Sequence, residues 1–182
     1  MVSSTIQERF KEFQKKKEES ILKYKDKIQI VIYGAYNPPN IDDHIGEKKR
    51  LEILRNRLKR EGYINTALVD DFEGDDVLNK SLNALEFADL NIIIFTCRGK
   101  TGSVARELIE AIYKPEILWK CRIYEEVFEQ ISAMETLLKE ELEAIRYKTV
   151  QVKREDDNDL FEFVVSDVFQ FLRRYVNVNA MR

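Results

Sequence analysis

The sequence predicts a single α/β domain built around a five-stranded parallel β-sheet. Short apolar runs rich in β-branched residues alternate with amphipathic helices, and the runs at 28–33 and 90–95 are apolar almost throughout. Strands that alternate with helices form right-handed βαβ units, whose parallel strands are buried on both faces. A chain of 182 residues with 44% hydrophobic residues can form one packed core. We therefore expect an N-terminal helix within residues 1–26 and one domain over 27–182.

The N-terminal segment is predicted to form a helix from about Ser4 to Lys25, with Ser3 or Ser4 as its cap. Lys and Glu cover one face of this helix. The other face carries a broken apolar stripe that consists of Ile6, Phe10, Phe13, Ile21 and Leu22. We expect the stripe to pack on the domain, and a contact between two copies of the chain is the alternative.

Strands and helices then alternate through the first part of the domain. A β-branched strand ends at Gly34, and Gly62 follows an amphipathic helix as a C-cap residue would. The predicted strands are 27–33, 64–69 and 90–95, and the predicted helices are about 47–60, 75–87 and 103–113.

The last part of the chain adds two predicted strands and two predicted helices. The predicted strands are 117–124 and 148–152, and the predicted helices are 127–145 and 158–176. The helix at 127–145 is expected because apolar residues recur at helical spacing through it. Five strands favour the order 2-1-3-4-5, which is a flavodoxin-like or Rossmann-like three-layer sandwich.

Bulk composition excludes several classes of protein. A formal net charge of −3 argues against nucleic acid as the partner. Cys97 and Cys121 form neither a disulfide framework nor a zinc pattern, and we expect both thiols to be reduced and buried. No secretory signal and no apolar run long enough for a membrane span is visible, so a cytoplasmic protein without membrane contact is expected.

The expected ligand site lies at the carboxyl ends of the first and third strands. Ligands of open α/β sheets bind outside the carboxyl ends of the strands, where the strand order reverses. With the order 2-1-3, that point brings together residues 34–44 and 96–107.

The segment after the third strand has the features of an anion site. Gly99 and Gly102 allow close backbone approach, and Thr101 or Ser103 can cap the helix that follows. The free N–H groups at such a helix start favour a phosphate. Arg98 and Lys100 add positive charge, although an ordinary capped helix with basic neighbours is the alternative.

Glu107 is the candidate catalytic group. A helix that starts at Ser103 places residues 103 and 107 on one face, so that the carboxylate could face the same pocket as the amides. A solvated surface acid is the alternative for Glu107.

The runs Ala88–Phe95 and Gly99–Leu108 resemble the nucleoside 2-deoxyribosyltransferase-like superfamily. Members of that group have Ala-Asp before an apolar strand, then a glycine and hydroxyl loop, then a helix that bears a glutamate. The Glu-Leu pair also resembles TIR domains, which share the five-stranded layout and use a glutamate to cleave NAD. The resemblance implies that Glu107 is a nucleophile or stabilises a ribosyl oxocarbenium ion.

The resemblance also implies ligand contacts elsewhere. Tyr33, Gly34, Tyr36 and Asn37 would border the base or ribose, and Asp89 would orient the loop or contact substrate. The loop carries Arg98 and Lys100 where that family carries an acid, which favours a phosphorylated ligand.

Other candidate sites and a second function remain open. His44 beside Asp42 and Asp43 could bind a metal or form a solvated turn, and Asp70-Asp71 could bind ribose hydroxyls. We predict no metal and no cofactor. The leading function is an N-glycosidase or ribosyl-transfer enzyme that acts on a nucleotide or nucleoside. The alternative is a non-catalytic nucleotide-sensing or TIR-like interaction domain, and a homodimer is a further expectation.

Overall fold

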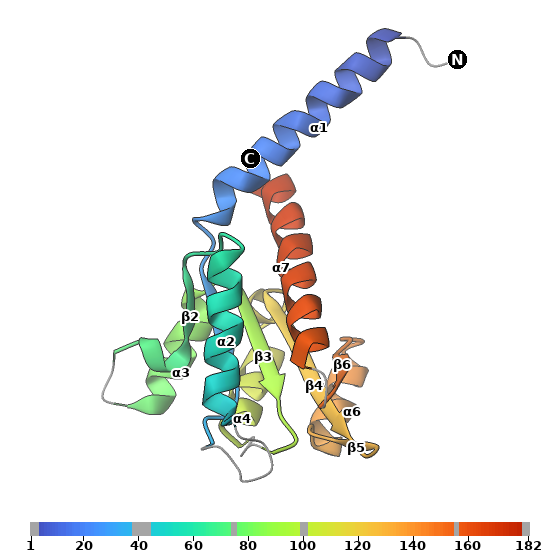
Figure 1. Ribbon diagram of the computed structural model, residues 1–182. Helices are drawn as coiled ribbons and strands as arrows, with labels where there is room; N and C mark the ends of the chain where they lie inside the picture. Colours follow the sequence, from blue (N-terminus) through green and yellow to red (C-terminus); the bar gives the residue numbers. More distant parts are fainter. Residues whose placement is uncertain (1–3, 38–44, 74–75, 99–101, 155–156, 180–182) are drawn as a thin grey trace.

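A computed structural model describes residues 4–37, 45–73, 76–98, 102–154 and 157–179 (Figure 1). Within these ranges the chain forms one mixed sheet with helices on both faces. Its strands are β1 (Ile30–Tyr33), β2 (Thr66–Leu68), β3 (Leu90–Phe95), β4 (Cys121–Phe128), β5 (Ile131–Ser132) and β6 (Val150–Lys153).

The sheet is only partly the parallel sheet that the sequence predicts. β2, β1, β3 and β4 lie side by side and are parallel, and β6 pairs in parallel with the far side of β4. The register aligns Ile30 with Leu90 and Asn91 with Cys121. The short strand β5 is antiparallel to the end of β4, where Val127 lies opposite Ser132. The α/β class is confirmed, and the sheet is mixed.

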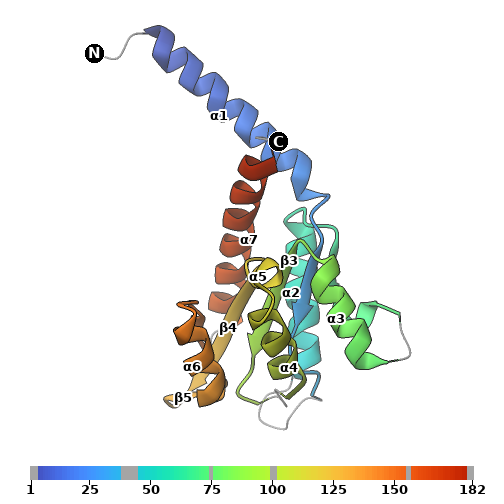
Figure 2. The same ribbon diagram turned by 180° about the vertical axis from the view of Figure 1, so that it is seen from behind.

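Two helical layers cover the sheet. The helices are α1 (Ser4–Lys25), α2 (Glu47–Arg60), α3 (Val77–Phe87), α4 (Gly102–Ile112), α5 (Pro115–Leu118), α6 (Thr136–Ala144) and α7 (Asp157–Asn179), with a 3-10 turn at Val69–Asp71. α2 and α7 cover one face, and α3, α4 and α6 cover the other, as the front and back views show (Figures 1 and 2). None of the helices in the described ranges combines the length and apolar character that a bilayer span requires.

The strands supply both cores through the two-residue period of a β-strand. Ile30 and Ile32 belong to the core under α2 and α7, whereas Val31 and Tyr33 belong to the core under α3 and α4. Every residue of β1 and β3 is buried. This two-sided burial is the reason that the strand sequences are continuously apolar.

The sequence prediction is wrong between residues 115 and 145. The predicted strand 117–124 is displaced, because Pro115 starts the short helix α5 and the strand runs from Cys121 to Phe128. The predicted helix 127–145 is α6 alone, preceded by a tight turn in which Glu129 and Gln130 have positive φ angles of 47° and 68°. Apolar residues of this hairpin fall by coincidence at the four-residue spacing of a helix, so the period was ambiguous.

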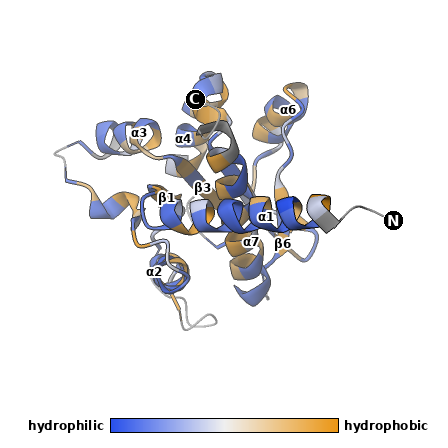
Figure 3. Ribbon diagram, turned by 90° about the horizontal axis from the view of Figure 1, so that it is seen from above, coloured by the Kyte–Doolittle hydropathy of each residue, from blue (hydrophilic) through white to orange (hydrophobic). Residues whose placement is uncertain are grey.

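α1 forms as predicted, but only its C-terminal end packs on the domain. Ile21 is buried in the core with α7, and the Tyr24 ring meets Tyr175 edge-on at 6.4 Å. Phe10 and Phe13, nearer the N-terminus, are 58% and 61% exposed. α1 projects beyond the domain in every view (Figures 1, 2 and 3). The expectation that this helix packs on the domain is therefore met only by its C-terminal end.

We expect unequal effects when the two ends of the α1 stripe are truncated. Ile21→Ala should lower the free energy of unfolding by about 2 kcal/mol or more, because it opens a cavity in the core. Phe13→Ala should change it by less than about 0.5 kcal/mol, because the ring is exposed. Urea denaturation of both variants measures the difference, and equal losses would contradict the projecting position of α1.

Candidate active site

Glu107 lies on the buried face of α4. Val104, Leu108 and Ala111 form that face at helical spacing, and Glu107 falls among them with a side chain that is only 7% exposed. The Ser81 hydroxyl, from α3, donates a hydrogen bond to Glu107 Oε1. The Glu107 carboxyl is therefore held between two helices, against the sequence alternative of a solvated surface acid.

Burial dominates the electrostatics of Glu107. It raises the pKa of this carboxyl to about 7, and the hydrogen bond from Ser81 offsets only part of the rise. Glu107 makes no ion pair with any residue in the described ranges. The carboxyl is thus close to half-ionised at neutral pH, which suits a group that must gain or lose charge during a reaction.

Two tyrosines from the end of β1 flank Glu107. Tyr33 is fully buried, and its hydroxyl lies 3.5 Å from the Ser81 carbonyl oxygen. Burial, followed by the nearby Glu107, raises the pKa of the Tyr33 hydroxyl. Burial, then Asp70 and Glu107, raises the pKa of Tyr36. Tyr36 is half-buried with its hydroxyl buried, whereas the whole Tyr33 side chain is buried and its hydroxyl lies against Ser81.

The loops after β1 and β3 meet at the carboxyl edge of the sheet. Asn37 Nδ2 donates to the Arg98 carbonyl oxygen at 3.0 Å, and the Asn37 carbonyl accepts from Glu47 N at 3.1 Å. The Arg98 guanidinium lies 5.7 Å from the centre of the Phe128 ring. Tyr36, Asn37, Arg98 and Glu107 therefore come from segments that the fold brings to one edge.

The predicted anion loop is only partly described. Gly102 and Ser103 are exposed at the start of α4, and a Cβ added at Gly102 would have no neighbour within 4 Å. Gly99, Lys100 and Thr101 lie outside the described residues. The candidate metal residues Asp42, Asp43 and His44 also lie outside them. Phosphate binding at this loop stays a prediction.

Two of the predicted ligand residues, Gly34 and Asp89, have packing roles in the structure. A Cβ on Gly34 would lie 2.8 Å from Leu51 Cδ1, so the glycine allows close contact between β1 and α2. Asp89 lies at the amino end of β3, away from the candidate site. Its carboxylate accepts Gln29 N at 2.9 Å and the Tyr175 hydroxyl at 3.1 Å. The structure therefore does not bring Asp89 to Glu107.

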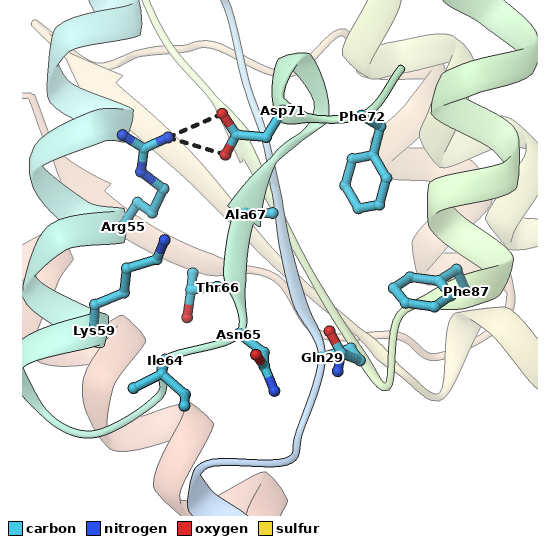
Figure 4. A pocket seen from close by; sticks show the side chains of 10 residues that line it. All are labelled: Gln29, Arg55, Lys59, Ile64, Asn65, Thr66, Ala67, Asp71, Phe72 and Phe87. Atoms are coloured by element: carbon cyan, nitrogen blue, oxygen red, sulfur yellow. Dashed lines mark hydrogen bonds and ion pairs between the residues drawn. The ribbon is translucent and has the colours of Figure 1, made fainter. Parts of the chain in front are cut away.

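Asp70 and Asp71 are paired with cations of α2. Lys48 Nζ lies 2.7 Å from Asp70 Oδ2, and Arg55 donates two hydrogen bonds to Asp71 at 2.9 and 3.0 Å. Burial raises the pKa of Asp71, but hydrogen bonds from Leu68 N and Arg55 outweigh it and hold the pKa below its usual value. Figure 4 shows Asp71 at one end of a cavity of about 490 Å³ beside β2. These ion pairs give both carboxylates a partner within the protein, so neither needs a ribose ligand to balance its charge.

Sequence reasoning missed a buried charged cluster at the ends of β4 and β6. Arg50 contacts Glu47 at 2.8 Å and Glu126 at 2.6 Å, and its Nε donates to Asp157 at 2.9 Å. Arg154 contacts Glu47 at 2.7 Å and Glu126 at 3.1 Å. The cluster joins α2, β4, β6 and α7. The acids at the end of the β4 run CRIYEEVF were the available signal.

The charged cluster also reaches the loop that precedes α4. Cys97 N donates to Glu126 Oε2 at 3.1 Å. Burial raises the pKa of Glu126, and Arg50 acts against that rise. The cluster therefore fixes the position from which the β3–α4 loop starts. Among the described residues, no group of three or more His, Cys, Asp and Glu side chains is arranged to hold a metal ion.

Replacing Glu107 should change how stability depends on pH. Its folded pKa of about 7 exceeds the usual value of 4.5, so the folded state holds this proton more tightly than the unfolded state. The associated stability is complete below about pH 4.5 and is lost as pH rises through about 7. Glu107→Gln cannot ionise and should exceed the native protein in stability at pH 8, by up to about 3 kcal/mol.

Denaturant unfolding of both proteins at pH 5 and pH 8 measures this difference. The gap between Glu107→Gln and the native protein should shrink toward pH 5. A gap that does not depend on pH would contradict a buried, uncompensated carboxyl.

Comparison with known proteins gives this site no relative. No family model, no curated protein and no solved structure matches the chain.

Proposed function

We propose that the protein cleaves or transfers the N-glycosidic bond of a nucleotide or nucleoside, with Glu107 as the catalytic residue. The observation that carries the proposal is the burial of the Glu107 carboxyl. The Ser81 hydroxyl donates a hydrogen bond to it, and no cation in the described ranges lies beside it. Such a carboxyl lowers stability when it ionises, and natural proteins retain costly groups of this kind mainly at functional sites.

The reaction needs a fixed carboxylate next to C1′ of the sugar. The bond between C1′ and the base nitrogen breaks, and the electron pair leaves on the base, which takes a proton from water. Positive charge builds on the sugar, and the Glu107 carboxylate stabilises it or forms an ester with C1′. Water then attacks C1′, which releases the sugar and restores the carboxylate.

Ser81 acts as a positioning residue in this proposal. Its hydroxyl engages Glu107 Oε1. Oε2, which bonds to no residue in the described part of the chain, is then the oxygen that faces the sugar. In this proposal Tyr36, which is half-buried and follows β1, contacts the base or ribose.

The arrangement of strands supports this placement. We infer that β2, β1, β3, β4 and β6 are the doubly wound, flavodoxin-like core, and that the antiparallel β5 is an addition to it. In that order the sequence of strands across the sheet reverses between β1 and β3, and Glu107 lies on the helix that follows β3. The resemblance to deoxyribosyltransferases and TIR domains assigns the same role to this glutamate. Arg98 and the start of α4 favour a phosphorylated ligand.

A non-catalytic interaction domain is the second candidate. The observation that favours it is the exposed apolar stripe of α1, in which Ile6, Phe10 and Phe13 are 58–61% exposed. An interaction surface and a catalytic Glu107 can be separated by experiment.

Nucleosides, nucleoside monophosphates and NAD should be incubated with the protein, and free base measured by chromatography. We expect base release from at least one of them. Glu107→Gln should reduce the rate on the order of 100-fold or more, because the charge on the sugar is no longer offset. Glu110→Gln, on the same helix, is the matched control and should retain the native rate. No base release from any substrate class would remove the enzymatic proposal and leave the interaction domain.

The pH dependence of the rate should follow Glu107. The ionised carboxylate is the active form, so the rate should rise with pH with a midpoint near pH 7 and then level off. Ser81→Ala removes the hydrogen bond that lowers this pKa, so the midpoint should move to higher pH. Ser81→Thr keeps a hydroxyl and should restore the native midpoint. A lower rate with an unchanged midpoint would mean that Ser81 only supports packing.

A further inference from the structure

The N-terminal half of α1 has no cover in the described part of the chain. Ile6, Phe10 and Phe13 are 59%, 58% and 61% exposed. Isolated helices of about 12–15 residues are marginal in water, so most helices gain their stability from packing of an apolar face. We therefore infer that another apolar surface packs against the projecting part of α1.

The exposed stripe continues the line of residues that already packs on the domain. At 100° per residue, Ile6, Phe10 and Phe13 share one face with Ile21 and Tyr24, which lie against α7. Leu22 is 65% exposed and lies on the opposite face. Figure 3 looks down on the molecule and shows α1 passing above α7 and reaching past the domain. The same face of α1 thus packs on the domain at its C-terminal end and is exposed to solvent at its N-terminal end.

The spacing of the stripe is that of a coiled-coil seam. Its apolar positions 6, 10 and 13 are separated by four and then three residues, and the same spacing continues through the polar Lys17 and Ser20 to Tyr24. The stripe is one residue wide on each turn. A helix that lies in a membrane surface needs a broader apolar face, whereas a narrow seam fits another helix.

The charges beside the seam are basic. α1 carries seven Lys and Arg residues and four Glu residues. Helical spacing places Lys17 in the seam, Arg9 and Lys16 within about a quarter turn of it, and all four Glu residues further round the helix. Arg9 and Lys17 have no ion-pair partner among the described residues, and Lys16 forms an ion pair with Glu12, one turn earlier, at 2.9 Å. The seam therefore offers positive charge to whatever covers it.

We propose that the N-terminal half of α1 binds an acidic amphipathic helix of a partner protein as a two-helix coiled coil. Apolar residues of the partner would cover Phe10 and Phe13, and its acidic flanks would face Arg9 and Lys16. Self-pairing is the weaker fit, because an antiparallel pair brings the basic flanks together and a parallel pair sets Lys17 opposite Lys17. This inference is independent of the proposal for Glu107.

A synthetic helix provides the direct probe. A fluorescently labelled peptide of three heptads, with Ile and Leu in the seam and Glu on both flanks, should bind the full chain with a Kd below about 100 µM. The same peptide with Lys on both flanks should bind at least about tenfold more weakly. Fluorescence anisotropy measures both affinities.

Matched variants on α1 locate the binding face. Phe10→Ser should weaken acidic-peptide binding about tenfold or more, whereas Leu22→Ser, of similar exposure on the opposite face, should leave it within about twofold. Arg9→Glu should weaken binding, and Lys15→Glu, the same charge change on the far side, should not. Circular dichroism of each variant confirms that the helix content is retained.

Several outcomes would overturn the inference. The proposal fails if neither peptide shows saturable binding, if both bind equally, or if Leu22→Ser weakens binding as much as Phe10→Ser. A dimer in light scattering that Phe10→Ser dissociates would assign the seam to a second copy. Phe10-dependent binding to phosphatidylserine vesicles, without peptide binding, would assign it to a membrane surface.

Discussion

Burial of the parallel sheet on both faces is the constraint on which the rest of the structure depends. β1 and β3 expose no side chain, so helices must cover each face and polar groups are largely kept out of these two strands. Asn91 is the exception within β3, and its amide bonds to the Leu85 carbonyl oxygen at 3.0 Å. Polar chemistry is therefore concentrated where the strands end. At the carboxyl edge this produces the Glu107 site on one face of the sheet and the charged cluster on the other.

The two acidic centres at that edge are buried in opposite ways. Glu126 lies between Arg50 and Arg154, so its charge is matched by guanidinium groups and it joins α2 to the end of the sheet. Glu107 has a hydroxyl from Ser81 and no cation beside it in the described ranges, and burial raises the pKa of both carboxyls to about 7. An acid that is paired with guanidinium groups ties helices to the sheet, whereas an acid with no cation beside it leaves its charge to interact with a ligand. This difference is the reason that Glu107, and not Glu126, is the candidate for catalysis.

Sequence patterns located most elements because their periods were unambiguous. The apolar run of β3 and the helical spacing of α2 coincide with the predicted ranges to the residue. The region from Pro115 to Ile145 was misread, because the apolar residues of a strand and a hairpin also fit a helical period. The charged cluster was missed for a different reason. Glu47, Glu126 and Arg154 are far apart in sequence, and nothing local distinguishes a buried acid in a strand from an exposed one.

The sequence by itself determined the α/β class, the order of most elements along the chain and the choice of Glu107 as a candidate, because these depend on local periodicity and residue type. Only the tertiary structure decided which residues share an environment. Folding separates Asp89 from the site, brings Ser81 of α3 to Glu107, and directs half of the α1 stripe away from the domain. Burial and charge pairing arise from contacts between distant segments, and those contacts determine the pKa of an acid and the exposure of an apolar face.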